Sequence, residues 1–178
     1  MSYTIDWLVK KYMSFFTEYG ITEQNIREQY EVWKNKSNRD DAKHYLWFVF
    51  QQMVILIPTQ TEQDSPRQHR LLRDVYFKMG EFMVTIEKKN GNHVKHLMLY
   101  HEIKGNDYQS TIELKIRIIS GHCCPFCDAL DKRELTFEEV LNDQPLASNK
   151  CTRQYGCNCT YAYFPQRDAA GNVIGKKN

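Results

Sequence analysis

The residues of this chain whose type and spacing point most directly to chemistry are its cysteines. Five of the six form an ordered array near the C-terminus. Thiolates are preferred ligands of zinc, which takes four of them in a tetrahedron, and a Cys-x2-Cys turn places two sulfurs at a suitable separation. The array therefore predicts a zinc site. Its members are Cys124, Cys127, Cys151, Cys157 and Cys159.

The array holds one thiol more than a single zinc ion needs. Cys124 and Cys127 supply two ligands, and two more must come from the return segment. Cys157 and Cys159 lie two residues apart, so in a strand both would face the metal; alternatively, Cys151 binds together with one of them. Four thiolates leave no open coordination position, which favours a structural ion over a catalytic one.

Other uses of these residues stay open. The cysteines could form disulfides or pack as plain core residues. The Cys-x2-Cys pair could be a thioredoxin-type redox motif, although no βαβ unit follows it. A catalytic zinc with His122 as a ligand would need a nearby base, and no Glu or His is placed to serve as one. The spacing does not determine whether His122 or Cys123 takes part in metal binding.

Helices are expected in the first part of the chain, because apolar residues recur there at helical spacing. Thr22 is a plausible N-cap, and Ser65 before Pro66 is an N-cap followed by proline at the first helical position. The polar run 35–41 is expected to be a loop. We expect Pro58 to end the third helix and the turn 90–92 to end the fourth. Residues 93–104 fit a short helix or a strand, and we favour the helix.

The pattern changes after Ser110. Residues 111–118 alternate between apolar and polar side chains, which predicts a half-buried strand leading into the first cysteine pair. Short strands are expected at 134–137 and 160–164, with a helical turn at 137–141. We therefore expect an α+β protein, with a helical domain at 1–107, a small zinc-binding module containing short strands at 108–166, and a tail at 167–178.

Composition narrows the classes of partner and location. Lys and Arg number 24 against 22 Asp and Glu, and the net charge of +2 is too small to demand nucleic acid or a membrane. No signal peptide is visible at the start, and the longest apolar stretch, around 45–58, is too short to span a bilayer. We expect a soluble, cytoplasmic protein with no membrane partner. In a reducing compartment, clustered cysteines favour metal binding over disulfides.

Residues 112–164 resemble the C-terminal zinc-binding segment of phage minor head proteins, the Mu F-like head morphogenesis group. In order, the shared features are a strand, the Cys-x2-Cys pair, an acidic helical turn, a loop containing Pro145, and a Cys-x-Cys pair that leads into a strand. Asn158 stands where the family has arginine, and Cys151 could stand in for its histidine. The resemblance implies a structural zinc ion and a role in head assembly.

Three functions follow from these patterns. We favour a non-enzymatic binding or assembly protein, phage-related or derived from a mobile element, that contacts a protein partner or itself. A nucleic-acid-binding zinc protein is the alternative, because basic and aromatic residues between Arg153 and Arg167 could contact phosphates and stack on bases. A metal-dependent hydrolase or nuclease is the third, although no catalytic motif is visible and His93, His96 and His101 do not share one helical face.

Overall fold

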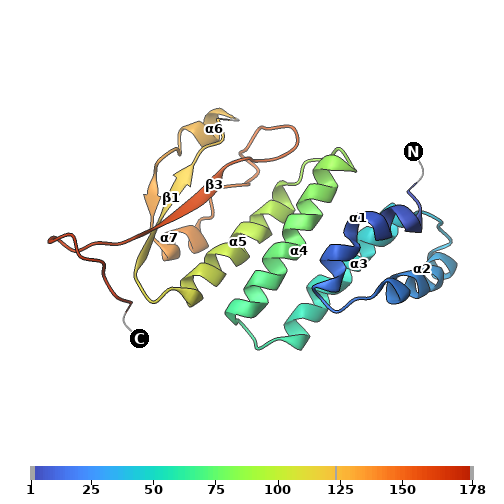
Figure 1. Ribbon diagram of the computed structural model, residues 1–178. Coiled ribbons are helices and arrows are strands. Elements are labelled where there is room, and N and C mark those ends of the chain that lie inside the picture. The colour runs from blue at the N-terminus through green and yellow to red at the C-terminus, as the bar shows by residue number, and fades with distance from the viewer. Residues whose placement is uncertain (1–2, 123, 177–178) are drawn as a thin grey trace. The chain divides into compact units, whose positions relative to one another are not determined.

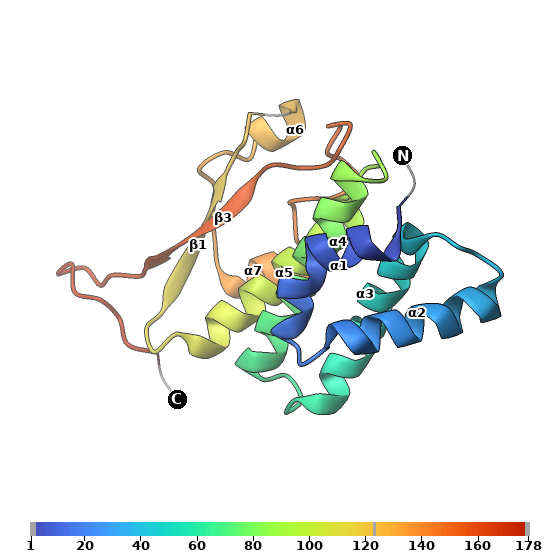
Figure 2. The same ribbon diagram turned by 45° about the vertical axis from the view of Figure 1, so that its right-hand side comes forward.

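Helices make up most of the fold, and a small antiparallel sheet lies in its C-terminal part, so the expected α+β class is confirmed (Figure 1, Figure 2). The computed structural model describes residues 3–122 and 124–176. Its elements are α1 (Ile5–Thr17), α2 (Glu23–Ser37), α3 (Ala42–Gln60), α4 (Pro66–Thr85), α5 (Asn92–Gln109), β1 (Leu114–Ile119), α6 (Pro125–Asp128), β2 (Glu134–Leu135), α7 (Phe137–Asn142) and β3 (Thr160–Pro165).

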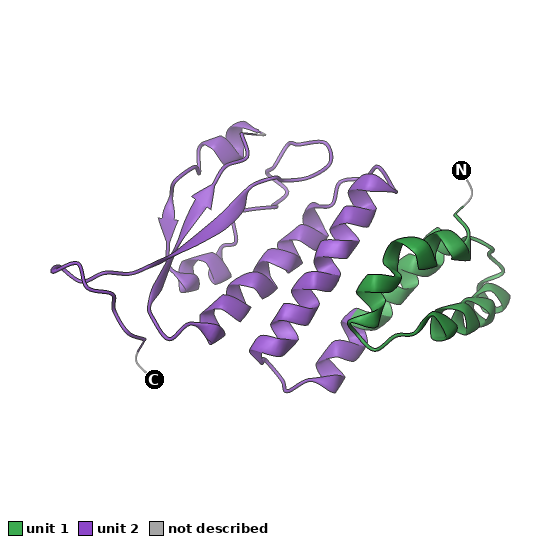
Figure 3. Cartoon of the chain, in the orientation of Figure 1, with its two compact units in different colours: residues 1–53 green, residues 54–178 purple. Residues whose placement is uncertain are grey.

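The chain forms two compact units, residues 1–53 and residues 54–178, and the boundary between them falls inside α3 (Figure 3). The second unit therefore contains α4 and α5 as well as the sheet and the cysteine array. The sequence placed a domain boundary between residues 107 and 108. That boundary is a statement about which part of the chain folds independently, and it stays a prediction.

The first unit is a set of helices with an aromatic core. Thr22 caps α2 as predicted, and the side chain of Asn25 completes a capping box. α2 continues to Ser37, so only the end of the polar run 35–41 is a loop, which begins at Asn38 in the left-handed conformation. Ring contacts join many of the core residues. The buried core consists of Leu8, Tyr12, Phe15, Phe16, Ile26, Tyr30, Ala42, Tyr45, Leu46, Val49, Phe50 and Met53.

Two expected helix ends lie elsewhere. Pro58 does not end α3 but sits in its last turn. A proline there removes only one hydrogen bond of the helix, and the Thr59 hydroxyl binds the carbonyl oxygen of Leu56 at the same end. α4 ends at Thr85, before the turn 90–92, and this turn leads directly into α5.

α4 and α5 are antiparallel neighbours in the second unit (Figure 1, Figure 2). Ser65 caps α4 and Pro66 occupies its first turn, as predicted. The helix favoured for residues 93–104 is present and extends to Gln109. It carries Leu99 and Ile103, both fully buried, toward the sheet.

The sheet has the strand order β2-β1-β3, with both pairs antiparallel. The alternation predicted for β1 is present, because Ile116 and Ile118 are fully buried while Lys115 and Arg117 point to the other face. The buried face packs against α5 and α7. This packing gives the cysteine array a rigid support.

The last described residues return to the start of β1. The main-chain N–H of Gln166 donates to Glu113 at 2.8 Å, and that of Lys176 donates to Thr111 at 2.9 Å. The Lys176 ammonium also binds the Asp107 carboxylate at 2.6 Å. The segment expected to be a tail therefore buries few side chains but is attached through its main chain.

Candidate metal centre

The structure brings all five cysteines of the array together in the core of the second unit. None of them forms a disulfide within the described residues, and each residue is at most 6% exposed. They come from three places in the chain: the turn after β1, the loop after α7, and the segment that enters β3. The five are Cys124, Cys127, Cys151, Cys157 and Cys159.

The sulfurs form two overlapping groups that share Cys127. In the first group the sulfurs of Cys124, Cys127 and Cys151 all lie within 4.8 Å of one another. The second group joins Cys127 to Cys157 and Cys159 within the same limit. Within these groups, the sulfurs of Cys124 and Cys151 lie 3.8 Å apart, and those of Cys127 and Cys157 lie 3.7 Å apart.

These separations fit a metal ion held by thiolates. With metal–sulfur bonds of about 2.3 Å, the sulfurs of a tetrahedral site lie about 3.8 Å apart. The pairs Cys124 with Cys151 and Cys127 with Cys157 have this spacing. Because the cluster is buried and consists of soft sulfur donors, it could hold a metal ion that needs no contact with solvent.

Local structure explains how the first pair is positioned. β1 ends just before the Cys-x2-Cys segment, and Pro125 begins the single turn α6 there. Cys124 is the N-cap of this turn, and its sulfur accepts the main-chain N–H of Cys127 at 3.4 Å. Across the site, the N–H of Gly121 donates to the Cys159 sulfur at 3.4 Å. Such N–H donors stabilise negative charge on sulfur.

The pKa values of the thiols differ across the cluster. Burial acts to raise the pKa of Cys124, but hydrogen bonds from the main chain of Cys127 and Thr152 and from neighbouring thiols outweigh it and lower the pKa to about 7. Burial raises the pKa of Cys127 far above its usual range and that of Cys157 to about 11. Without a cation, Cys127 and Cys157 therefore keep their protons at neutral pH.

His122 is not part of the cluster. Its side chain is 79% exposed and pairs with Asp128 at 3.2 Å, and its main chain has a positive φ of 47°. Within residues 3–122 and 124–176, the groups able to hold a metal ion contain only cysteines. Cys123, whose participation the sequence left open, lies outside the described residues.

The turn 90–92 anchors the segment that carries the last three cysteines. The Asn92 side-chain oxygen accepts the N–H of Cys157 at 2.6 Å, and the Lys95 ammonium donates to the Cys157 carbonyl at 2.7 Å. The Asn90 amide donates to the carbonyl oxygen of Arg153 at 3.1 Å. The sequence showed this turn only as a helix stop, because its partners lie more than fifty residues away.

The basic and aromatic residues that suggested nucleic-acid binding do not form one surface. Some lie in the core or form internal hydrogen bonds, and others lie in a separate loop. Tyr161 is 4% exposed and belongs to the core, and the Tyr163 hydroxyl donates to Glu102 at 3.2 Å. Arg167 donates to the carbonyl oxygen of Gly171 at 2.7 Å. Arg153 and Tyr155 lie apart from these residues, in the loop before the last cysteine pair.

Sequence reasoning missed a second polar cluster, partly buried, which joins α4 to α5. His69 Nε2 lies 2.8 Å from the Asp64 carboxylate, and His69 Nδ1 lies 2.8 Å from Nδ1 of His101. The Tyr108 hydroxyl also donates to Asp64. Burial, followed by the influence of His69, lowers the pKa of His101 to about 4. The sequence compared His101 with His93 and His96, whereas its partner is on the other helix.

Among the described residues, no helix is both long enough and apolar enough to cross a membrane. Comparison of the chain with protein-family models, curated proteins and solved structures finds no match. The arrangement of its own residues therefore carries the functional argument.

Proposed function

We propose that this protein is a non-enzymatic binding or assembly protein whose C-terminal module is held in shape by one structural zinc ion. The observation that carries the proposal is the buried cluster of five thiols, in which two sulfur pairs have the spacing of a tetrahedral thiolate site. A closed, buried site of this kind stabilises the fold of the module around it. It leaves no open coordination position on the ion for a substrate.

Two sulfur pairs suggest the ligand set. Cys124 with Cys151 and Cys127 with Cys157 would form opposite edges of one tetrahedron once an ion draws together the two groups that share Cys127. The fifth thiol, Cys159, would then be a buried neighbour that accepts the N–H of Gly121. We therefore infer that zinc is bound by Cys124, Cys127, Cys151 and Cys157. The thiol of Cys159 would influence the negative charge on these four sulfurs.

Metal content tests the proposal directly. The purified protein is expected to contain one zinc per chain by elemental analysis, and zinc binding is expected to release protons because thiols of raised pKa must ionise. Cys157→Ser should abolish stoichiometric zinc, whereas Cys159→Ser should retain it. Absence of zinc from the wild-type protein would remove the basis of the proposal, and the reverse pattern of the two variants would correct the ligand set.

The binding role draws on the resemblance to phage minor head proteins and on exposed apolar side chains of the second unit. Phe77 is 51% exposed, Tyr155 39% and Leu97 38%. Side chains of this type are enriched where proteins bind one another. The role predicts self-association or co-purification with a protein partner that persists after nuclease treatment, measured by light scattering on a sizing column.

The same preparation separates the alternatives. Strong, salt-dependent binding to DNA or RNA at low ionic strength would favour the nucleic-acid-binding protein instead. Metal-dependent turnover that one polar substitution abolishes would favour a hydrolase. A monomeric protein with neither property and no partner would contradict the assembly role.

A further inference from the structure

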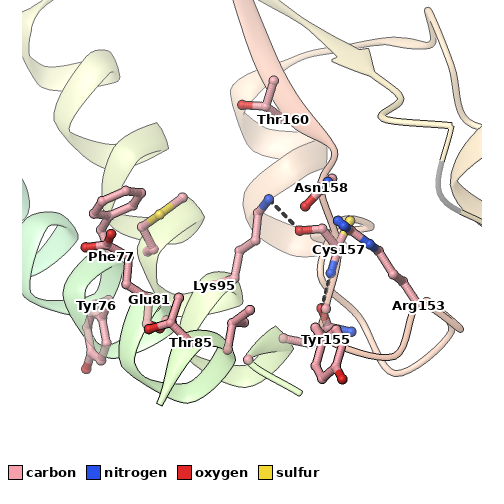
Figure 4. A pocket seen from close by; sticks show the side chains of 16 residues that line it. Tyr76, Phe77, Glu81, Thr85, Lys95, Arg153, Tyr155, Cys157, Asn158 and Thr160 are labelled. Carbon is pink, nitrogen blue, oxygen red and sulfur yellow. Dashed lines mark hydrogen bonds between the residues drawn. The ribbon is translucent and has the colours of Figure 1, made fainter. Parts of the chain in front are cut away.

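A pocket opens in the second unit between the helices α4 and α5 and the loop that carries Cys157 (Figure 4). Its volume of about 450 Å³ lies in the range of pockets that hold small molecules. One side is lined by Tyr76, Phe77 and Met98 from the helices, and the other by Tyr155 and Arg153 from the loop. The walls are therefore largely apolar and aromatic.

Two cationic side chains reach this pocket from opposite sides. The Lys95 ammonium donates one hydrogen bond to the Cys157 carbonyl and keeps further N–H groups for a ligand (Figure 4). Among the described residues, 3–122 and 124–176, Arg153 forms no ion pair with a carboxylate. The acidic lining residue, Glu81, is already paired with Lys78 at 2.7 Å. The pocket therefore has an excess of positive charge.

The start of α5 adds to this charge. Gly91 and Asn92 line the pocket; Gly91 has no side chain to cap the helix, and the Asn92 N–H donates to the Asn90 side-chain oxygen at 2.8 Å. A helix of 18 residues carries partial positive charge at its N-terminus, which favours an anion there. The N-terminus of α5, the Lys95 ammonium and the Arg153 guanidinium thus all place positive charge at one cavity. Part of the wall of this cavity is aromatic.

We propose that this pocket binds a small organic anion, with a carboxylate or phosphate between Lys95 and Arg153 and an aromatic or apolar body against Tyr155 and Tyr76. Charge-assisted hydrogen bonds would hold the anionic group, and ring contacts would hold the body. This inference rests on the proposed function, since the loop of Arg153 and Tyr155 also carries the candidate zinc ligands.

The loop connects the pocket to the metal centre. Gly156 has a φ of +110°, which brings the main chain of this loop close to Asn92. The N–H of Gly91 donates to the Tyr155 carbonyl at 3.4 Å, and Cys157 is bound through both its N–H and its carbonyl. Loss of the ion would release the wall that carries Arg153 and Tyr155, so anion binding is expected to require metal.

Calorimetric titration of the zinc-loaded full chain tests the proposal with three probes. N-acetyltryptophan carries the carboxylate of a peptide end, phenyl phosphate carries a phosphate, and N-acetyltryptophanamide is the uncharged match of the first. At least one anion should bind roughly tenfold more tightly than the amide, a difference of about 1.4 kcal/mol. The tighter anion identifies whether the ligand is a carboxylate or a phosphate.

Arg153→Glu should weaken anion binding roughly tenfold or more, which matches one strong charge-assisted hydrogen bond. Arg70→Glu makes the same charge change on an exposed part of α4 outside the pocket and should leave binding within about twofold. Equal binding of the amide, or equal effects of the two variants, would overturn the proposal. Zinc content of the same sample separates the causes: zinc present without anion binding refutes the pocket alone, and zinc absent refutes the proposed function as well.

Discussion

The first unit and the cysteine-bearing core of the second unit are stabilised by different kinds of side chain. The first buries mainly large aromatic and aliphatic residues such as Phe16, Tyr45 and Phe50. In the second core, five of the fourteen buried residues are cysteines. Thiols bury little apolar area, so hydrophobic stabilisation is smaller there. We therefore expect the first region to fold by packing alone and the second to need an ion.

Removal of the metal should have the largest effect and should separate the two regions. Structural zinc in small modules contributes about 10 kcal/mol or more, so Cys127→Ser or a strong chelator should unfold the chain from about residue 120 onward. Hydrogen exchange measured by mass spectrometry should show protection lost there and kept in α1 and α2. Simultaneous loss of protection in both regions would contradict the comparison.

The reverse experiment weakens the aromatic core. Phe16 is fully buried, and Phe16→Ala should cost about 3–5 kcal/mol because it leaves a cavity. Chemical denaturation should report this loss. Zinc content should be unchanged, and Ile55→Ala, at a residue 61% exposed, serves as a control with little effect. A Phe16→Ala variant that also loses its zinc would show that the regions are not separable.

Low pH should reduce the free energy of unfolding of the second unit, through the contact between His69 and His101. The folded pKa of His101 is lowered to about 4, so between pH 6.5 and about 4 the unfolded chain binds more protons than the folded one. Stability should therefore be present above pH 6.5 and fall as the pH drops through this window, by at most about 3 kcal/mol.

The titratable neighbours of this histidine pair include Asp64, Tyr108, Tyr76 and Tyr100. His101→Gln should flatten the pH profile measured by thermal unfolding. His44→Gln, at an exposed histidine paired with Asp41, is the matched control. An unchanged profile in His101→Gln would assign the acid sensitivity elsewhere.

The smallest predicted effect concerns the close approach beside the metal centre. A Cβ on Gly121 would lie 2.9 Å from the Cβ of Asn158, so Gly121→Ala should push the two parts of the site apart and cost about 1–3 kcal/mol. Gly105→Ala would meet only an ordinary contact, at 3.6 Å, in the middle of α5, and should be neutral or slightly stabilising. Competition with a chelator should show weaker zinc binding for Gly121→Ala alone.

Local signals in the sequence predicted much of the secondary structure. Thr22, Ser65 and Pro66 mark helix starts because capping depends on a few neighbouring residues. The alternation of 111–118 predicted β1 because a half-buried strand exposes every second side chain. Pro58 misled the prediction, because a proline in the last turn of a helix breaks only one hydrogen bond.

The residue order alone indicates that five clustered cysteines are available to one site, because thiol chemistry and short spacings are local properties. Which sulfurs are neighbours depends on the folded chain, since Cys124 meets Cys151 and Cys127 meets Cys157 across long loops. It also decided that the turn 90–92 holds the loop of the last cysteines and that His69 meets His101. These contacts join segments far apart in the chain, and no local pattern of residues encodes them.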